Sequence, residues 1–182
     1  MRKAIGVLMI VVVVGGYIWM TRSQYSKEEV VAEQAHKATK VGEQIEEIQK
    51  TIKSQYPSNP KEVVEMHNKL MGICYKNTLS DKEIKTYAET VRQLYAIEFN
   101  ELNSQDSQIS ALEEEQKAIG TEGMQLVTSE ITETYIAKDN KGAENTAEVN
   151  VMHVTNLGST ERTYFLIKEN NEWKINGWET AK

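Results

Sequence analysis

The stretch TYFLIKENNEWKINGWE, residues 163–179, holds two short apolar runs on either side of a polar ENNE segment. The first run, residues 163–168, is rich in aromatic and β-branched residues, and the second places Trp173 and Ile175 two positions apart. Runs of this kind around a turn-forming segment predict two antiparallel strands. We therefore expect the fold to end in a β-hairpin.

Asn176-Gly177 lies inside the second run, where an Asn-Gly pair ordinarily predicts a hairpin turn. Only residues 178–182 follow it in this sequence, too few for a useful return strand. We instead expect a β-bulge, because glycine permits positive φ and one extra residue resets the alternation of side chains. The bulge would bring Trp178 to the face that carries Trp173, whereas plain alternation would place the two rings on opposite faces.

Two further strands precede this hairpin. After Gly123 the apolar period becomes alternating, and one face of a half-buried strand carries Val127, Ile131 and Tyr135. A second strand follows the KDNKG turn, and its alternating residues are Ala147, Val149, Val151 and His153. Four strands joined by turns at roughly twelve-residue spacing predict an antiparallel meander.

Helical periodicity fills the chain between the N-terminal segment and Gly123. The first helix falls within residues 23–56 and carries an a/d-type stripe of Val31, Ala38, Val41, Ile45, Ile48 and Ile52. We interpret it as a juxtamembrane helix that packs on its own domain. A dimerising stalk through residues 31–52 is the alternative. We favour it less, because three heptads are barely enough for a coiled coil.

Pro57 and Pro60 break this first helix. Asn59 is the expected cap of a second helix, with Pro60 in its first turn. Ser80 and Glu83 form the capping box of a third. That third helix has an apolar face of Ile84, Ala88, Val91, Tyr95 and Leu102, and a fourth helix covers about residues 108–119. Helices first and strands afterwards predict an α+β fold.

The first 22 residues predict a membrane anchor. Arg2 and Lys3 precede an uncharged run at residues 4–20, and about 17 residues span roughly 26 Å, near the lower limit for crossing a bilayer. The residues after the run fit a signal-peptidase site poorly, so we expect an uncleaved signal anchor. Because the basic end tends to stay in the cytoplasm, we expect a single-pass cell-membrane protein whose C-terminal domain is extracytoplasmic.

Composition argues against several classes of protein. A net charge of −6 with scattered basic residues argues against nucleic-acid binding. The only cysteine, Cys74, excludes an intramolecular disulfide and argues against a zinc site, and it lies on the apolar face of its helix as a core residue would. His67 cannot activate it, because seven helical residues separate the two by roughly 10 Å. We expect no metal and no cofactor.

The order of elements resembles the nuclear transport factor 2-like (cystatin-like) superfamily, with NPKEVVEMHNKL (residues 59–70) opening the domain and EWKINGWE (residues 172–179) ending it. The resemblance covers most of a domain that we place at residues 57–182. It implies a long, bent antiparallel sheet wrapped around helices to form a cone. Uncharacterised bacterial membrane-anchored or lipoprotein-type families share this layout, as does the inner-membrane scaffold component of type IV secretion.

A binding site in such a cone would be lined by Tyr95, Glu133, Tyr135, His153, Tyr164, Trp173 and Trp178. We can align no catalytic motif from the superfamily's enzymes with this chain. The expected function is therefore a non-enzymatic, membrane-anchored extracytoplasmic module for binding or assembly, with a protein partner or a second copy as possible contacts. The alternative is a small hydrolase or isomerase, which would need inward ionisable groups within hydrogen-bond reach.

Overall fold

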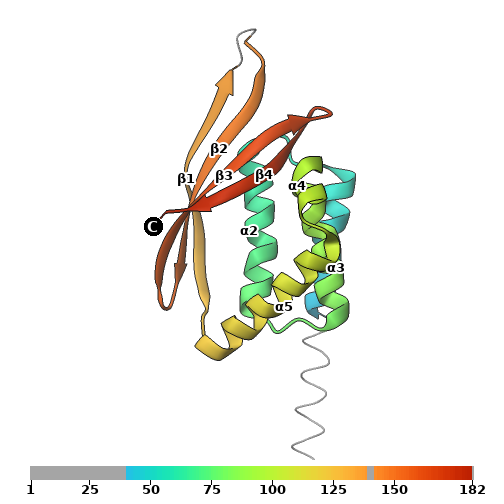
Figure 1. Ribbon diagram of the computed structural model, residues 1–182, viewed down its shortest axis with the longest axis vertical. Helices are drawn as coiled ribbons and strands as arrows, with labels where there is room; N and C mark the ends of the chain where they lie inside the picture. The colour runs from blue at the N-terminus through green and yellow to red at the C-terminus, as the bar shows by residue number, and fades with distance from the viewer. Residues whose placement is uncertain (1–39, 139–141, 182) are drawn as a thin grey trace, which may run out of the picture. The chain divides into compact units, whose positions relative to one another are not determined.

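The computed structural model describes residues 40–138 and 142–181. A helix at residues 40–54 is followed by α2 (Pro60–Lys76), α3 (Asp81–Val91), the 3-10 turn η1 (Arg92–Leu94), α4 (Ile97–Leu102) and α5 (Gln105–Glu122). The strands β1 (Leu126–Lys138), β2 (Glu144–Thr155), β3 (Gly158–Glu169) and β4 (Glu172–Thr180) form one antiparallel sheet in the order β1-β2-β3-β4 (Figure 1). The predicted α+β class and the four-stranded meander are confirmed.

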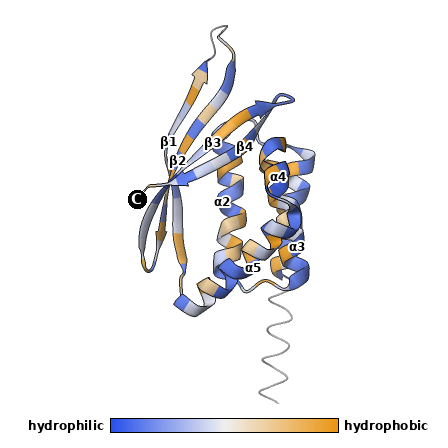
Figure 2. Cartoon of the chain, viewed as in Figure 1, coloured by the Kyte–Doolittle hydropathy of each residue, from blue (hydrophilic) through white to orange (hydrophobic). Residues whose placement is uncertain are grey.

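One hydrophobic core joins the helices to the inner face of the sheet. α2 lies along that face (Figure 1), and its buried residues recur at helical spacing: Pro60, Val63, Val64, His67, Leu70, Met71 and Cys74. The strands alternate between hydrophobic and hydrophilic residues (Figure 2), as a sheet with one covered face requires. Among the described residues, Tyr164 of β3 is the largest fully buried side chain.

The helix at residues 40–54 is part of this core. Ile45 is fully buried, Val41 and Ile52 are nearly so, and all three belong to the compact unit that spans Val41–Lys182. We interpreted the apolar stripe as packing on its own domain. This interpretation holds for the described part of the stripe, from Val41 to Ile52. The domain also begins earlier than the boundary that we placed at residue 57.

The predicted anchor at residues 1–22 lies outside the part of the chain that the structure describes, as do residues 23–39 of the predicted juxtamembrane helix. A dimer contact through residues 31–52 stays a prediction. Among residues 40–138 and 142–181, no helix combines the length and the apolar character needed to cross a membrane.

Side-chain caps start α2 and α3 where the sequence predicts. The Asn59 side chain accepts a hydrogen bond from the Glu62 backbone N–H at 3.0 Å. Ser80 and Glu83 form the reciprocal capping box at the start of α3. A cap of this kind contributes about 1 kcal/mol to helix stability.

The third predicted helix ends earlier than we expected. The chain leaves the helix at Tyr95, and the Ala96 N–H donates to the Ile175 carbonyl of β4 at 2.9 Å instead of continuing the helical ladder. The short α4 then begins at Ile97. Leu102, which we expected to face inward, is 78% exposed at its end. The break turns Tyr95 toward the sheet.

β1 departs from simple alternation because two of the three shifts in its pairing with β2, those after Leu126 and after Ile131, leave an extra residue in β1. Each shift inserts an extra residue and reverses the faces of the residues that follow. Thr134 consequently shares the inner face with Ile131, while Glu133 and Tyr135 lie on the outer face and are exposed. Our placement of Glu133 and Tyr135 in the cone interior is therefore wrong.

The bulge predicted in the last strand is confirmed. The register of β3 and β4 shifts by one residue at Asn176, and Gly177 has a φ of 157°. Trp178 therefore lies on the same face as Trp173, and its ring centroid is 6.0 Å from that of His67 on α2.

Replacing Gly177 with Ala is expected to destabilise the domain by about 1 kcal/mol, because residues with a Cβ rarely adopt its backbone conformation. No atom lies within 4 Å of the added methyl group, so the loss comes from the backbone alone. Gly120→Ala in α5 is the matched control, with equally open surroundings, and should stabilise the helix by about 0.5–1 kcal/mol. Urea unfolding followed by circular dichroism measures both, and equal effects would contradict the bulge geometry.

Candidate functional site

A cavity of about 270 Å³ lies between the helices α2 to α5 and the inner face of β3 and β4. We call it the inner pocket. Its aromatic wall consists of Tyr87, Tyr95, Phe99 and Trp178, and its remaining lining residues include His67, Met71, Asn103, Ser107, Gln108, Glu115 and Arg162. A concave, mostly apolar cavity with a few polar groups is the usual form of a small-ligand site.

His67 and Tyr95 meet in the inner pocket, with 3.2 Å between the imidazole Nε2 and the phenol oxygen. Burial lowers the pKa of His67 to about 3, helped by the charge of Arg162 and by His153. Burial also raises the pKa of Tyr95 far above its ordinary value, with Tyr164 adding to the effect. Both side chains are therefore uncharged at neutral pH.

Aromatic rings pack edge to face or tilted around this pair. Phe99 contacts Tyr95 at a centroid distance of 5.0 Å and Trp178 at 5.3 Å. Trp178 is 38% exposed, so it forms part of the pocket's rim as well as its wall. Such contacts contribute about 0.5–1.5 kcal/mol each beyond the area that they bury.

Arg162 brings a positive charge into this aromatic surrounding. It lies two residues before Tyr164 on the inner face of β3. Its guanidinium carbon is 5.9 Å from the centre of the Tyr164 ring and 5.8 Å from that of Trp178, within the range of cation–π attraction. Its Nη1 donates a long hydrogen bond of 3.4 Å to the Tyr164 hydroxyl.

His153 lies in a separate cavity that shares Arg162 with the inner pocket. Its Nδ1 is 2.8 Å from the Ser129 hydroxyl, while its Nε2 is buried with no hydrogen-bond partner. Burial, followed by the charge of Arg162, lowers the pKa of His153 to about 4, so the ring is neutral at physiological pH.

The predicted lining residues do not form one site. Tyr95 and Trp178 line the inner pocket, and the Tyr164 ring lies behind it, 6.1 Å from that of Trp178. Trp173 is buried in the core away from the pocket, and its carbonyl accepts a hydrogen bond from the Tyr56 hydroxyl at 2.8 Å. The two candidates on β1 are on the outer face.

Most residues of the inner pocket were absent from our predicted lining, among them His67 and Arg162. His67 follows Val64 and precedes Leu70 at the spacing of the buried face of α2, so periodicity alone placed it inward. Arg162 precedes Tyr164 by two positions on a strand, which also places it on the inner face. We weighed His67 as a metal ligand and as a partner for Cys74 but not as a pocket residue, and we did not weigh Arg162.

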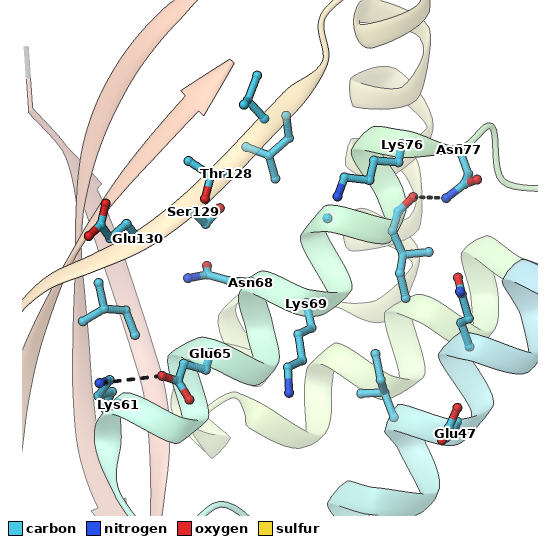
Figure 3. Close-up of a pocket in the computed structure, with 17 residues that line it drawn as sticks. Glu47, Lys61, Glu65, Asn68, Lys69, Lys76, Asn77, Thr128, Ser129 and Glu130 are labelled. Atoms are coloured by element: carbon cyan, nitrogen blue, oxygen red, sulfur yellow. Dashed lines mark hydrogen bonds and ion pairs between the residues drawn. The ribbon is translucent and has the colours of Figure 1, made fainter. Parts of the chain in front are cut away.

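A larger, open groove of about 860 Å³ lies between β1, α2 and the helix at residues 40–54 (Figure 3). Exposed side chains of both signs line it, including Lys61 and Glu65, which form an ion pair of 3.9 Å, and Lys69. Glu130 adds an acidic group from the facing strand. Because opposite charges are interspersed along this groove, it favours neither an anion nor a cation, and the inner pocket is the better candidate.

Cys74 is buried on the inner face of α2, and Gln116 donates to its carbonyl at 2.6 Å and to its sulfur at 3.1 Å. Burial raises the pKa of the thiol to about 12, with Glu115 adding to the effect. Among the residues that the structure covers, no group of three or more His, Cys, Asp or Glu side chains could hold a metal ion.

Native Cys74 is expected to react with a thiol reagent on the order of 100-fold more slowly than the same residue in urea, because the thiolate forms only when the core opens. The measurement is the rate of absorbance change with 5,5′-dithiobis(2-nitrobenzoate). An exposed cysteine introduced by Glu114→Cys supplies the control for reagent access. Comparable rates at both positions would contradict the burial of Cys74.

The fold and the inner pocket together define an α+β domain with a small, aromatic-walled cavity. Residues 2–178 match the family described as a domain of unknown function, DUF6715, and the chain belongs to that family. No curated protein matches the chain. Among solved structures it is similar to a de novo designed β-sheet protein determined by solution NMR, at 17% identity over 66% of this chain and 88% of the other, with a TM-score of 0.31.

Proposed function

We propose that this chain is a non-enzymatic binding or assembly module, anchored in the cell membrane by its first 22 residues, and that its extracytoplasmic domain receives a ligand in the inner pocket. The aromatic pocket with its neutral His67–Tyr95 pair carries the proposal. Neutral groups can orient a ligand by hydrogen bonding, but with pKa values so far from 7 they are poorly suited to proton transfer at neutral pH.

The proposal includes the cone of the nuclear transport factor 2-like superfamily. Its support is the order of elements, in which helices precede a four-stranded antiparallel meander that packs on them through one face. The bulge at Asn176 supports it further, because bulges bend a strand and so curve a sheet around its helices.

Ligand entry is tested with the full chain in lipid nanodiscs, titrated calorimetrically with the neutral probe 3-phenylpropanamide against empty nanodiscs. Ala111 lines the inner pocket, so Ala111→Trp should fill it and weaken binding at least about tenfold. Ala118→Trp is the control, because Ala118 is an exposed residue of the same helix that does not line the pocket. Equal affinities in the three proteins would contradict the pocket as the binding site.

Topology is tested by labelling intact bacterial cells with a membrane-impermeant maleimide. The Glu114→Cys variant should be labelled without lysis, whereas the buried Cys74 of the parent chain should give little background. Labelling of the variant only after lysis would contradict the extracytoplasmic placement.

A small hydrolase is the second candidate, favoured by the 2.8 Å contact between the Ser129 hydroxyl and His153 Nδ1. A neutral imidazole beside a hydroxyl is the arrangement that activates a serine nucleophile. Hydrolysis of p-nitrophenyl acetate should then fall to background in Ser129→Ala and in His153→Gln. Identical rates in the parent chain and both variants would remove this candidate.

A further inference from the structure

We propose that the inner pocket binds an organic carboxylate with an apolar body, and that the Arg162 guanidinium holds the carboxylate group. This inference rests on the proposed binding function and specifies the chemical class of the ligand.

Several N–H donors of the Arg162 guanidinium have no hydrogen-bond acceptor in the described structure. In the part of the chain that the structure describes, no carboxylate forms an ion pair with it, although three such pairs occur elsewhere. A guanidinium carries five N–H donors, and here one of them makes the 3.4 Å contact to Tyr164 while the Nε is buried with no partner. Arg162 is half-buried, so its guanidinium has lost part of its hydration, and an anion in the pocket would supply hydrogen-bond acceptors in its place.

The surroundings hold the guanidinium in place without neutralising it. The rings of Tyr164 and Trp178 both lie within 6 Å, and cation–π attraction holds the planar group beside them. His67 and His153 stay neutral beside it, so neither adds a second positive charge. The Arg162 guanidinium is therefore the single positive group at this end of the described pocket.

The shape of the site selects the class of anion. Arg162 is the only Lys or Arg among the residues that line the inner pocket in the described structure, and the pocket's walls are largely aromatic and aliphatic. A planar carboxylate matches one guanidinium through two parallel hydrogen bonds. A phosphate carries more charge and would favour several cations, so a monocarboxylate with a hydrophobic body fits better.

Glu115 is the one acidic side chain that lines the described pocket, and it opposes an anion there. Its Oε1 accepts a hydrogen bond from the Tyr75 hydroxyl at 2.7 Å. Its negative charge should therefore weaken carboxylate binding, which makes Glu115 a control of opposite sign to Arg162.

The test compares 3-phenylpropionate with 3-phenylpropanamide, which differ only in the charged group, using the full chain in nanodiscs at pH 7 by calorimetry. The propionate should bind at least about tenfold more tightly, because charge-assisted hydrogen bonds in a partly buried site are stronger than neutral ones. Arg162→Gln should abolish this preference, so that the variant binds the propionate and the amide with equal affinity. Glu115→Gln should raise the propionate affinity about two- to threefold by removing like-charge repulsion.

A second pair of probes, N-acetylphenylalanine and its amide, distinguishes two sources of the carboxylate: a free organic acid and the C-terminus of a peptide. Preference for both acids indicates that free organic acids suffice, and preference for N-acetylphenylalanine alone indicates the C-terminus of a peptide. Equal binding of acid and amide in each pair, or a preference that survives Arg162→Gln, would overturn the inference while amide binding still supports the pocket. If Arg162→Gln fails to fold, the Glu115→Gln variant decides, and an unchanged preference for the acid over the amide in that variant would overturn the carboxylate inference. Absence of amide binding to the parent chain would instead reject the proposed function.

Discussion

Ile45→Ala should lower the free energy of unfolding by about 3 kcal/mol, within the range for truncating a buried isoleucine. Ile45 is fully buried between the helix at residues 40–54 and the rest of the core. A loss of this size would confirm the interpretation that the sequence favours, a juxtamembrane helix that packs on its own domain. A chain that begins at Ser23, unfolded in urea and followed by circular dichroism, gives the measurement.

Glu46→Ala is the matched control for Ile45→Ala, because Glu46 is the exposed next residue of the same helix. Its effect should stay within about 0.5 kcal/mol, as for most surface substitutions. A loss for Ile45→Ala no larger than that of the control would show that the helix contributes little to the core, and the stalk interpretation would then be preferred.

Acid should destabilise the domain, and His67 is the main cause. Its pKa is about 3 in the fold, below the ordinary value near 6.5, so the unfolded chain binds more protons as the pH falls below 6.5. Stability is therefore complete above about pH 6.5 and is lost progressively toward pH 3. At pH 5 the expected loss from His67 is about 2 kcal/mol. The groups that face this ring, Tyr95, Tyr164 and Arg162, provide no negative charge to stabilise a protonated imidazole.

The His67→Gln variant separates this effect from other titrations, since Gln can still hydrogen-bond to Tyr95 but does not ionise. Urea midpoints between pH 7 and pH 5 should fall less steeply in the variant. Some slope should remain, because His153 also has a lowered pKa in the fold. An unchanged slope would contradict the assignment of the acid sensitivity to His67.

The sequence predicted those elements whose signals are local. Asn59, Ser80 and Glu83 cap helices by contacts within four residues, and the order of helices and strands followed from the change of period after Gly123. The bulge at Gly177 was predictable because an Asn-Gly pair inside a strand conflicts with regular pairing.

The two bulges in β1 had no such signal. Their extra residues, Val127 and Thr132, are β-branched and favour strands, so the sequence there reads as an unbroken strand. The break at Tyr95 was equally hidden, because the bond that replaces the helical ladder reaches Ile175, far along the chain. Pairing between segments that are distant in sequence determined both the bulges in β1 and the break at Tyr95.

The candidate site was only partly predictable for a related reason. Helical periodicity placed Tyr95 inward and the expected bulge placed Trp178 inward, and periodicity would also have given the faces of His67 and Arg162. It could not show that these four side chains, from α2, the turn after η1, β3 and β4, surround one cavity. That convergence depends on the packing of the helices on the sheet.

The most direct test of the account is an NMR titration of the full chain in nanodiscs with 3-phenylpropionate, following the Arg162 Nε–H and the tryptophan indole N–H signals. The Arg162 Nε–H signal should shift when the carboxylate pairs with the guanidinium to which this buried N–H belongs. The Trp178 indole signal should shift with the same dissociation constant, whereas that of Trp173, buried away from the pocket, should stay in place. Signals of Arg162 and Trp178 that do not move at saturating ligand would contradict the inner pocket as a carboxylate-binding site.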